Sequence, residues 1–101
     1  MHPVDQAIKE RVADRKRQLM ALPPDELRRL PLYTVEPFSA EGKVQELGFY
    51  HDKTRKGEDI IVVQCKRLIF LGYGHMHAEG FVLDASDKTR EAEEDLLWDY
   101  K

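Results

Sequence analysis

The sequence lacks several features that mark whole classes of protein. Its single cysteine, Cys65, cannot form a disulfide within the chain, which is typical of proteins in the reducing cytoplasm. No apolar run approaches the roughly 20 residues that a membrane-spanning helix needs. The longest mainly apolar segment, residues 60–73, is interrupted by Gln64, Lys66 and Arg67. The first residues also lack the apolar core of a signal peptide, so we expect a cytoplasmic protein with no membrane partner.

The chain also lacks a strong charge of one sign. Its 101 residues include 16 Lys and Arg against 19 Asp and Glu, a formal net charge of −3. Nucleic-acid-binding domains are normally basic, so we expect no nucleic-acid partner. The charge is uneven, with +2 in residues 1–30, −1 in residues 31–83 and −4 in residues 84–101. Opposite charge at the two ends favours their contact, either within one chain or between two copies.

The length corresponds to one domain spanning residues 1–101, and its first third has the periodicity of a helix. Pro3 suits a first turn and Asp5 complements the positive end of the helix dipole, which predicts a helix from about Pro3 to Ala21. A proline pair ends it, and Pro24–Leu30 is expected to form a short second helix. The apolar residues of the first helix fall within one arc: Val4, Ala7, Ile8, Val12, Leu19 and Leu22.

Arg11 and Arg15 lie in the middle of this apolar arc. In one interpretation their methylene stems cover apolar surface while the guanidinium groups reach water. In the other, they pair with carboxylates across an interface, because a guanidinium that leaves water needs an acidic partner.

From Leu32 onward the apolar period becomes that of a strand. Leu32–Val35 is expected to be a short strand that ends at Glu36 and Pro37, and a proline confines a strand to a sheet edge. Three longer strands follow, joined by short glycine-containing loops typical of hairpins: residues 43–52, 59–71 and 75–83. The sequence therefore predicts an α+β domain in which the N-terminal helix packs on an antiparallel meander of three or four strands.

The remaining segment, residues 84–101, is expected to form a short helical or extended tail. Leu96, Leu97 and Trp98 are its apolar residues, and we expect them to pack back on the domain.

Loop lengths predict the strand registers. A first loop at residues 53–57 places Phe49 opposite Ile61, and a second hairpin centred on Tyr73 places Arg67 opposite Glu79. In these registers both faces of the sheet are largely apolar, and such strands are normally covered on both faces. We therefore expect a second copy of the chain to cover part of the second face, which would make the protein a homodimer. The alternative is that the C-terminal tail and residues 24–30 suffice to cover it. The expected interface residues are Arg11, Arg15, Ile60, Val62 and Phe70.

One polar cluster could carry chemistry. His75, His77 and Glu79 alternate along one predicted strand, so their side chains project from the same face. The simplest interpretation has two partly exposed histidines beside an Arg67–Glu79 ion pair. Alternatively, His75 and His77 share a transition-metal ion such as zinc. In a third interpretation Arg67, His75, His77 and Glu79 bind a small ligand, with Tyr73 at the rim, or His77 held by Glu79 acts as a catalytic base.

We therefore expect a cytoplasmic, non-enzymatic interaction or accessory protein that dimerises through an apolar sheet face and its N-terminal helix. The alternative is a ligand or metal site at the polar cluster, with or without catalysis. No recognised catalytic motif favours an enzyme.

Overall fold

The computed structural model describes residues 3–70 and 73–100, and side chains are described for residues 3–65 and 76–100. The helices are α1 (Pro3–Met20), α2 (Pro24–Arg28) and α3 (Glu94–Leu97), followed by the 3-10 helix η1 (Trp98–Tyr100). The strands are β1 (Tyr33–Ala40), β2 (Lys43–Lys53), β3 (Asp59–Phe70), β4 (Tyr73–Leu83) and β5 (Thr89–Glu91). They form one antiparallel sheet in the order β1-β2-β3-β4-β5. The α+β class is confirmed, but the sheet has five strands instead of three or four, because the tail contributes β5 as well as a helix.

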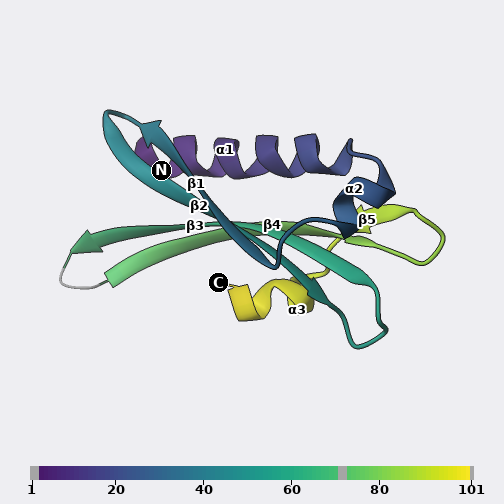
Figure 1. Ribbon diagram of the computed structural model, residues 1–101. Helices are drawn as coiled ribbons and strands as arrows, with labels where there is room; N and C mark the ends of the chain where they lie inside the picture. The colour runs from purple at the N-terminus through teal and green to yellow at the C-terminus, as the bar shows by residue number, and fades with distance from the viewer. Residues whose placement is uncertain (1–2, 71–72, 101) are drawn as a thin grey trace.

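The two faces of the sheet are covered by different parts of the chain (Figure 1). The long helix α1 lies across one face, which we call the first face, and α3 with η1 lies against part of the second face. Among the described residues, no helix combines the length and apolar character needed to cross a membrane.

The first face carries the larger core. The apolar arc of α1 is buried there as predicted, and it packs on side chains from β2, β3 and β4. This core contains Val4, Ile8, Val12, Leu19, Leu47, Ile61, Val63, Phe81 and Leu83.

Strand β1 is longer than predicted. The expected end at Glu36 and Pro37 is wrong, because β1 continues through both residues to Ala40. Among the described residues β1 pairs with β2 alone, so one side of its backbone has no neighbouring strand there, and a proline that lacks an N–H can be accommodated. The expected edge position of this strand is confirmed.

Both predicted hairpin registers are wrong by an even number of residues. Phe49 lies opposite Val63 instead of Ile61. Arg67 lies opposite His75 and Glu79 lies opposite Val63, so the predicted Arg67–Glu79 pair does not form a cross-strand rung. Even shifts leave each side chain on its predicted face, so the division of the sheet into two faces survives the error.

The C-terminal segment covers the second face near β3 and β4. Leu97 is buried against Ile60, Val62, Ala78 and Val82, with Leu96 and Tyr100 packed beside it. Gly80 makes this contact close, because a Cβ atom there would lie 2.8 Å from the Ile61 carbonyl oxygen and 3.0 Å from Leu97.

Two expectations about this region are corrected. Ile60 and Val62, expected in a dimer interface, are buried beneath the chain's own C-terminal segment. Trp98, expected to pack back, is 76% exposed, and Tyr100 packs in its place.

Candidate functional site

The predicted polar cluster lies only partly in the described region. The side chains of Arg67, Phe70, Tyr73 and His75 lie outside it, so their predicted roles as ligand, metal or interface residues are not tested. His77 and Glu79 are described, and the structure brings them together: Nε2 of His77 lies 3.3 Å from a carboxylate oxygen of Glu79.

Glu79 also binds a residue that the sequence did not single out. Lys16 of α1 reaches across to the sheet, and its Nζ lies 3.0 Å from Glu79 and 2.7 Å from Glu91 of β5. We call these four residues, Lys16, His77, Glu79 and Glu91, the Lys16 cluster. Its ion pairs join α1 to β4 and β5.

Burial and pairing compete within the Lys16 cluster. Burial acts to lower the pKa of Lys16, but hydrogen bonds to Glu91 and Glu79 outweigh it and raise the pKa above the ordinary value. Burial acts to raise the pKa of Glu79, but Lys16 and then His77 hold it below the usual range. Both groups are therefore charged near neutral pH, and the Glu79 carboxylate is shared, with Lys16 at one oxygen and His77 at the other.

No group of three or more His, Cys, Asp and Glu side chains that could hold a metal ion is found in the described part of the chain. Cys65 lies in the core of the first face, where burial raises the pKa of its thiol to about 11. A thiol with that pKa is neither a ready nucleophile nor a ready metal ligand.

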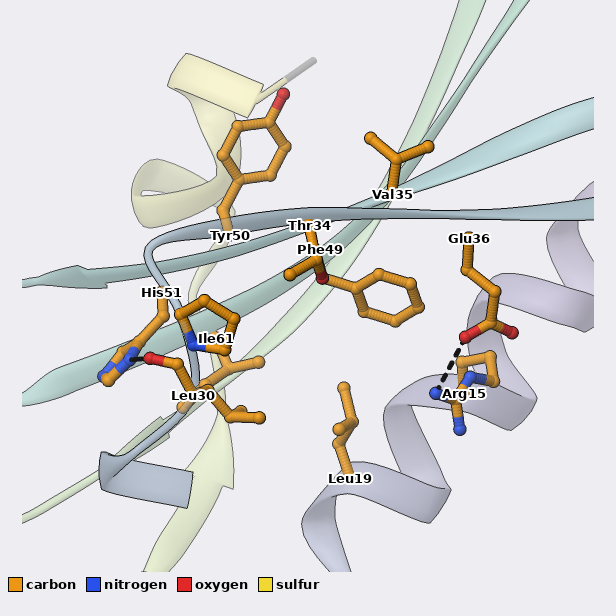
Figure 2. A pocket seen from close by; sticks show the side chains of 11 residues that line it. Arg15, Leu19, Leu30, Thr34, Val35, Glu36, Phe49, Tyr50, His51 and Ile61 are labelled. Atoms are coloured by element: carbon orange, nitrogen blue, oxygen red, sulfur yellow. Dashed lines mark hydrogen bonds and ion pairs between the residues drawn. The ribbon is translucent and has the colours of Figure 1, made fainter. Parts of the chain in front are cut away.

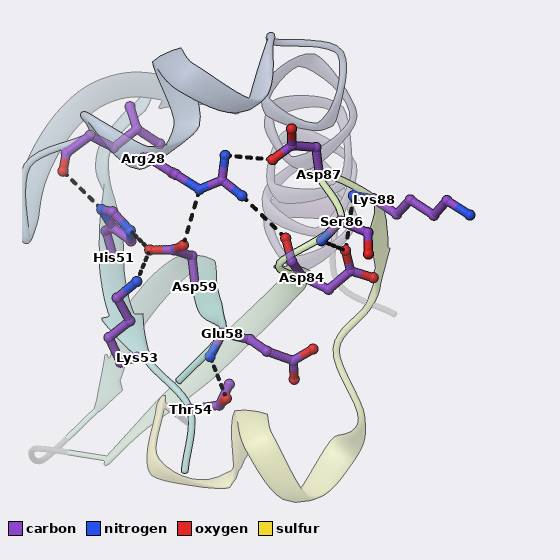
Figure 3. A network of polar contacts seen from close by, with 11 residues as sticks. Arg28, His51, Lys53, Thr54, Glu58, Asp59, Asp84, Ser86, Asp87 and Lys88 are labelled. Atoms are coloured by element: carbon purple, nitrogen blue, oxygen red, sulfur yellow. Dashed lines mark hydrogen bonds and ion pairs between the residues drawn. The ribbon is translucent and has the colours of Figure 1, made fainter. Parts of the chain in front are cut away.

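A second polar network surrounds Asp59, the first residue of β3 (Figure 3). His51 Nδ1 lies 2.9 Å from the Leu30 carbonyl oxygen, and its Nε2 lies 2.8 Å from Oδ1 of Asp59. Lys53 lies 3.0 Å from the same carboxylate. Arg28 of α2 approaches Asp59 at 3.7 Å and binds Asp87 at 2.6 Å, so the network fastens α2 and the β4–β5 loop to this end of the sheet.

The His51–Asp59 pair stabilises the fold and is not arranged for catalysis. Burial acts to raise the pKa of Asp59, but hydrogen bonds from His51 and Lys53 lower it overall. Both ring nitrogens of His51 are already engaged, one with the Leu30 carbonyl oxygen and the other with Asp59, so neither is free to accept a substrate proton. A general base needs such a nitrogen, which argues against catalysis by His51.

A small cleft of about 140 Å³ lies between α1, the α2–β1 connection and strands β1 and β2. Figure 2 shows the side chains of Leu19, Phe49 and Ile61 between His51 at one end and the Arg15–Glu36 ion pair at the other. The Val35 side chain points away from the cleft, toward the second face of the sheet.

The two arginines of the apolar arc converge on Glu36, which lines this cleft together with Arg15. Arg11 and Arg15 both bind Glu36 of β1, at 3.0 and 3.1 Å. The Arg15 guanidinium also lies over the Phe49 ring, 5.3 Å from its centroid. The guanidinium groups thus pair with a carboxylate, as the second interpretation held, but that carboxylate belongs to the same chain.

An exposed apolar surface lies where the C-terminal segment ends. Tyr33, Val35, Val44 and Met76 are between 37% and 75% exposed. The strand registers place all four on the second face, beyond the residues that pack on Leu97. We call these residues the open patch.

A row of three tyrosines marks the boundary of the open patch. The Tyr33 and Tyr50 ring centroids lie 4.9 Å apart, and those of Tyr50 and Tyr100 lie 5.2 Å apart. The row therefore connects the edge strand to the C-terminal segment.

Sequence reasoning missed the partners of Lys16 and of Glu36. The predicted register did place His51 near Asp59, but it did not predict the hydrogen bond between them. One signal for Glu36 was available, since an acidic residue in an apolar edge strand suits the two arginines of the apolar arc. The partners of Lys16 depend on the register and on β5, neither of which the sequence determines. Comparison of the chain with protein-family models, curated proteins and solved structures finds no match.

Proposed function

We propose that the protein is a non-enzymatic, cytoplasmic interaction module that forms a homodimer through the open patch. The observation that carries this proposal is the cluster of exposed apolar side chains on one half of the second face. Exposed apolar side chains gathered on one face are typical of interaction sites, and here they share the face with the exposed Glu46. The N-terminal helix is not part of the proposed interface, because Arg11 and Arg15 are already paired with Glu36.

A second copy is the occupant that suits this surface. The segments of the chain that cover the second face, α3 and η1, pack against Ile60, Val62, Ala78 and Val82 and leave the half with Val35 and Val44 exposed. Two antiparallel sheets pack readily face to face, and a two-fold axis lets one patch bury its own copy.

The edge of β1 is a poor alternative contact. Pro37 lies in the middle of this edge strand and has no N–H to offer a further strand. We therefore expect contact between sheet faces, without a continuous intermolecular sheet. Because the open patch is small, we expect a weak dimer with a dissociation constant of about 1 to 100 μM.

The test is sedimentation equilibrium of the wild type and of Val44→Glu over about 1 to 500 μM protein. Leu32→Glu is a matched control, because Leu32 is 76% exposed and Val44 is 75% exposed, but Leu32 precedes β1 at its far end. The proposal predicts a wild-type dimer, a Val44→Glu monomer and a Leu32→Glu dimer, all with the same far-UV circular dichroism.

Two results would overturn the proposal. A wild type that stays monomeric throughout this range excludes the dimer. A Val44→Glu variant that dimerises as well as the wild type excludes the open patch as its interface.

A further inference from the structure

The cleft beside α1 has one polar end and an otherwise apolar lining. Its volume of about 140 Å³ is close to the roughly 150 Å³ of a protein cavity that accommodates benzene. Leu19 and Ile61 belong to the buried core, and Leu30 and Phe49 pack against that core. An apolar body of about six to eight non-hydrogen atoms would suit this lining.

The polar end of the cleft has more positive than negative charge. Arg11 and Arg15 share the single carboxylate of Glu36, so this group of three carries a net charge of +1. The Nε of Arg15, the arginine that lines the cleft, is buried and has no hydrogen-bond partner among the described residues. A buried charged donor without an acceptor is unfavourable, and the oxygen of an anion would remove this deficit.

The rest of the lining offers little to a polar ligand. His51, at the other end, has both ring nitrogens occupied by Leu30 and Asp59. Thr34 contributes a hydroxyl, and Tyr50 directs its own hydroxyl to Gln64. A ligand with one charged end and an apolar body is therefore matched better than a sugar or a nucleotide, which need polar partners along their whole length.

We propose that this cleft binds a small apolar monocarboxylate. The carboxylate lies at Arg15 and the apolar body lies among Leu19, Phe49 and Ile61. The Arg15 guanidinium already donates to Gln18 and Glu36, and its remaining N–H groups, including that of Nε, can donate to a carboxylate ligand. The site lies on the first face of the sheet and does not depend on dimerisation through the open patch.

The probe is benzoate, with benzamide as its neutral counterpart of nearly the same shape. Both are titrated into the wild-type protein and followed by NMR chemical shifts of the methyl groups of Leu19 and Ile61 and the ring of Phe49. Saturable shifts at these residues are expected with benzoate, and at least about tenfold weaker binding is expected with benzamide.

Arg15→Gln tests the polar end, and Arg17→Gln is its matched control. Arg17 lies on the same helix, is exposed and pairs with Asp14 away from the cleft. Arg15→Gln is expected to weaken benzoate binding at least about tenfold, whereas Arg17→Gln leaves it unchanged.

Three results would overturn the proposal: no saturable benzoate binding, equal binding of benzamide, or shifts located away from the cleft. The comparison of benzoate with benzamide uses the wild type, so it still tests whether the cleft selects a carboxylate even if Arg15→Gln unfolds.

Discussion

The two faces of the sheet are made by the same strands, yet they are covered in very different ways. The first face lies beneath α1, whose 18 residues bury a continuous apolar arc. The second face lies beneath α3, which has four residues, and η1, which has three. Strands that are apolar on both faces are expected to be covered on both, but the length of the covering segment decides how much of each face is buried.

The difference between the faces predicts that truncating a buried side chain to alanine costs more stability on the first face than on the second. Phe81→Ala removes a fully buried ring from the first face, and we expect the free energy of unfolding to fall by about 4 kcal/mol. Leu97→Ala, on the second face, should cost about 2 kcal/mol, because the short C-terminal segment can adjust around the smaller side chain. Urea denaturation measures both, and an equal or larger loss for Leu97→Ala would contradict the comparison.

The Lys16 cluster links the two faces, because Glu91 belongs to the strand that leads into α3. Lys16→Met leaves Glu79 and Glu91 without their cation, and we expect a loss of about 3 kcal/mol. Hydrogen exchange should also show faster exchange at the Leu96 amide, which bonds to Glu93. Lys9→Met, an exposed position on the same helix, should change neither quantity. If hydrogen exchange at the Leu96 amide is unchanged in Lys16→Met, the Lys16 cluster does not stabilise the C-terminal segment on the second face.

The smallest expected effect is a dependence on pH. The pKa of Asp59 is lower in the folded protein than its ordinary value of 3.8. Asp59 therefore stabilises the fold above its unfolded pKa, and this contribution is lost as the pH falls through the lower folded pKa. We therefore expect the free energy of unfolding to fall on acidification below about pH 4.

Asp59→Asn tests this dependence. The variant should be less stable at neutral pH, and its unfolding free energy should fall less steeply in acid than that of the wild type. Asp25→Asn, at an exposed position on α2, should keep the wild-type profile. Parallel acid profiles for the wild type and Asp59→Asn would contradict the assigned role.

Sequence periodicity predicted the faces of the strands better than their partners. The apolar arc of α1 and the edge position of β1 follow from side-chain spacing and from the missing N–H of Pro37. The registers do not, because a shift of two or four residues preserves the same alternation. The first loop occupies residues 54–58 instead of 53–57, and that change alone moves the partner of Phe49 from Ile61 to Val63.

The candidate sites were harder to predict because they join distant segments. Lys16 and Glu91 are separated by 75 residues, and Arg11 and Glu36 by 25. Charge counting did anticipate contact between the basic first segment and the acidic last segment. It could not identify which lysine or arginine would be taken out of water, because burial of Lys16 depends on how α1 lies over β4 and β5.

The exposed position of Trp98 has a spectroscopic consequence. Trp98 is the single tryptophan of the chain and stands on the C-terminal segment with its side chain 76% exposed. Its indole is hydrated before the protein unfolds, so intrinsic fluorescence will change little when the core beneath α1 melts. The contacting rings of Tyr33, Tyr50 and Tyr100 are better placed, because near-ultraviolet circular dichroism of that row will disappear when the C-terminal segment leaves the sheet.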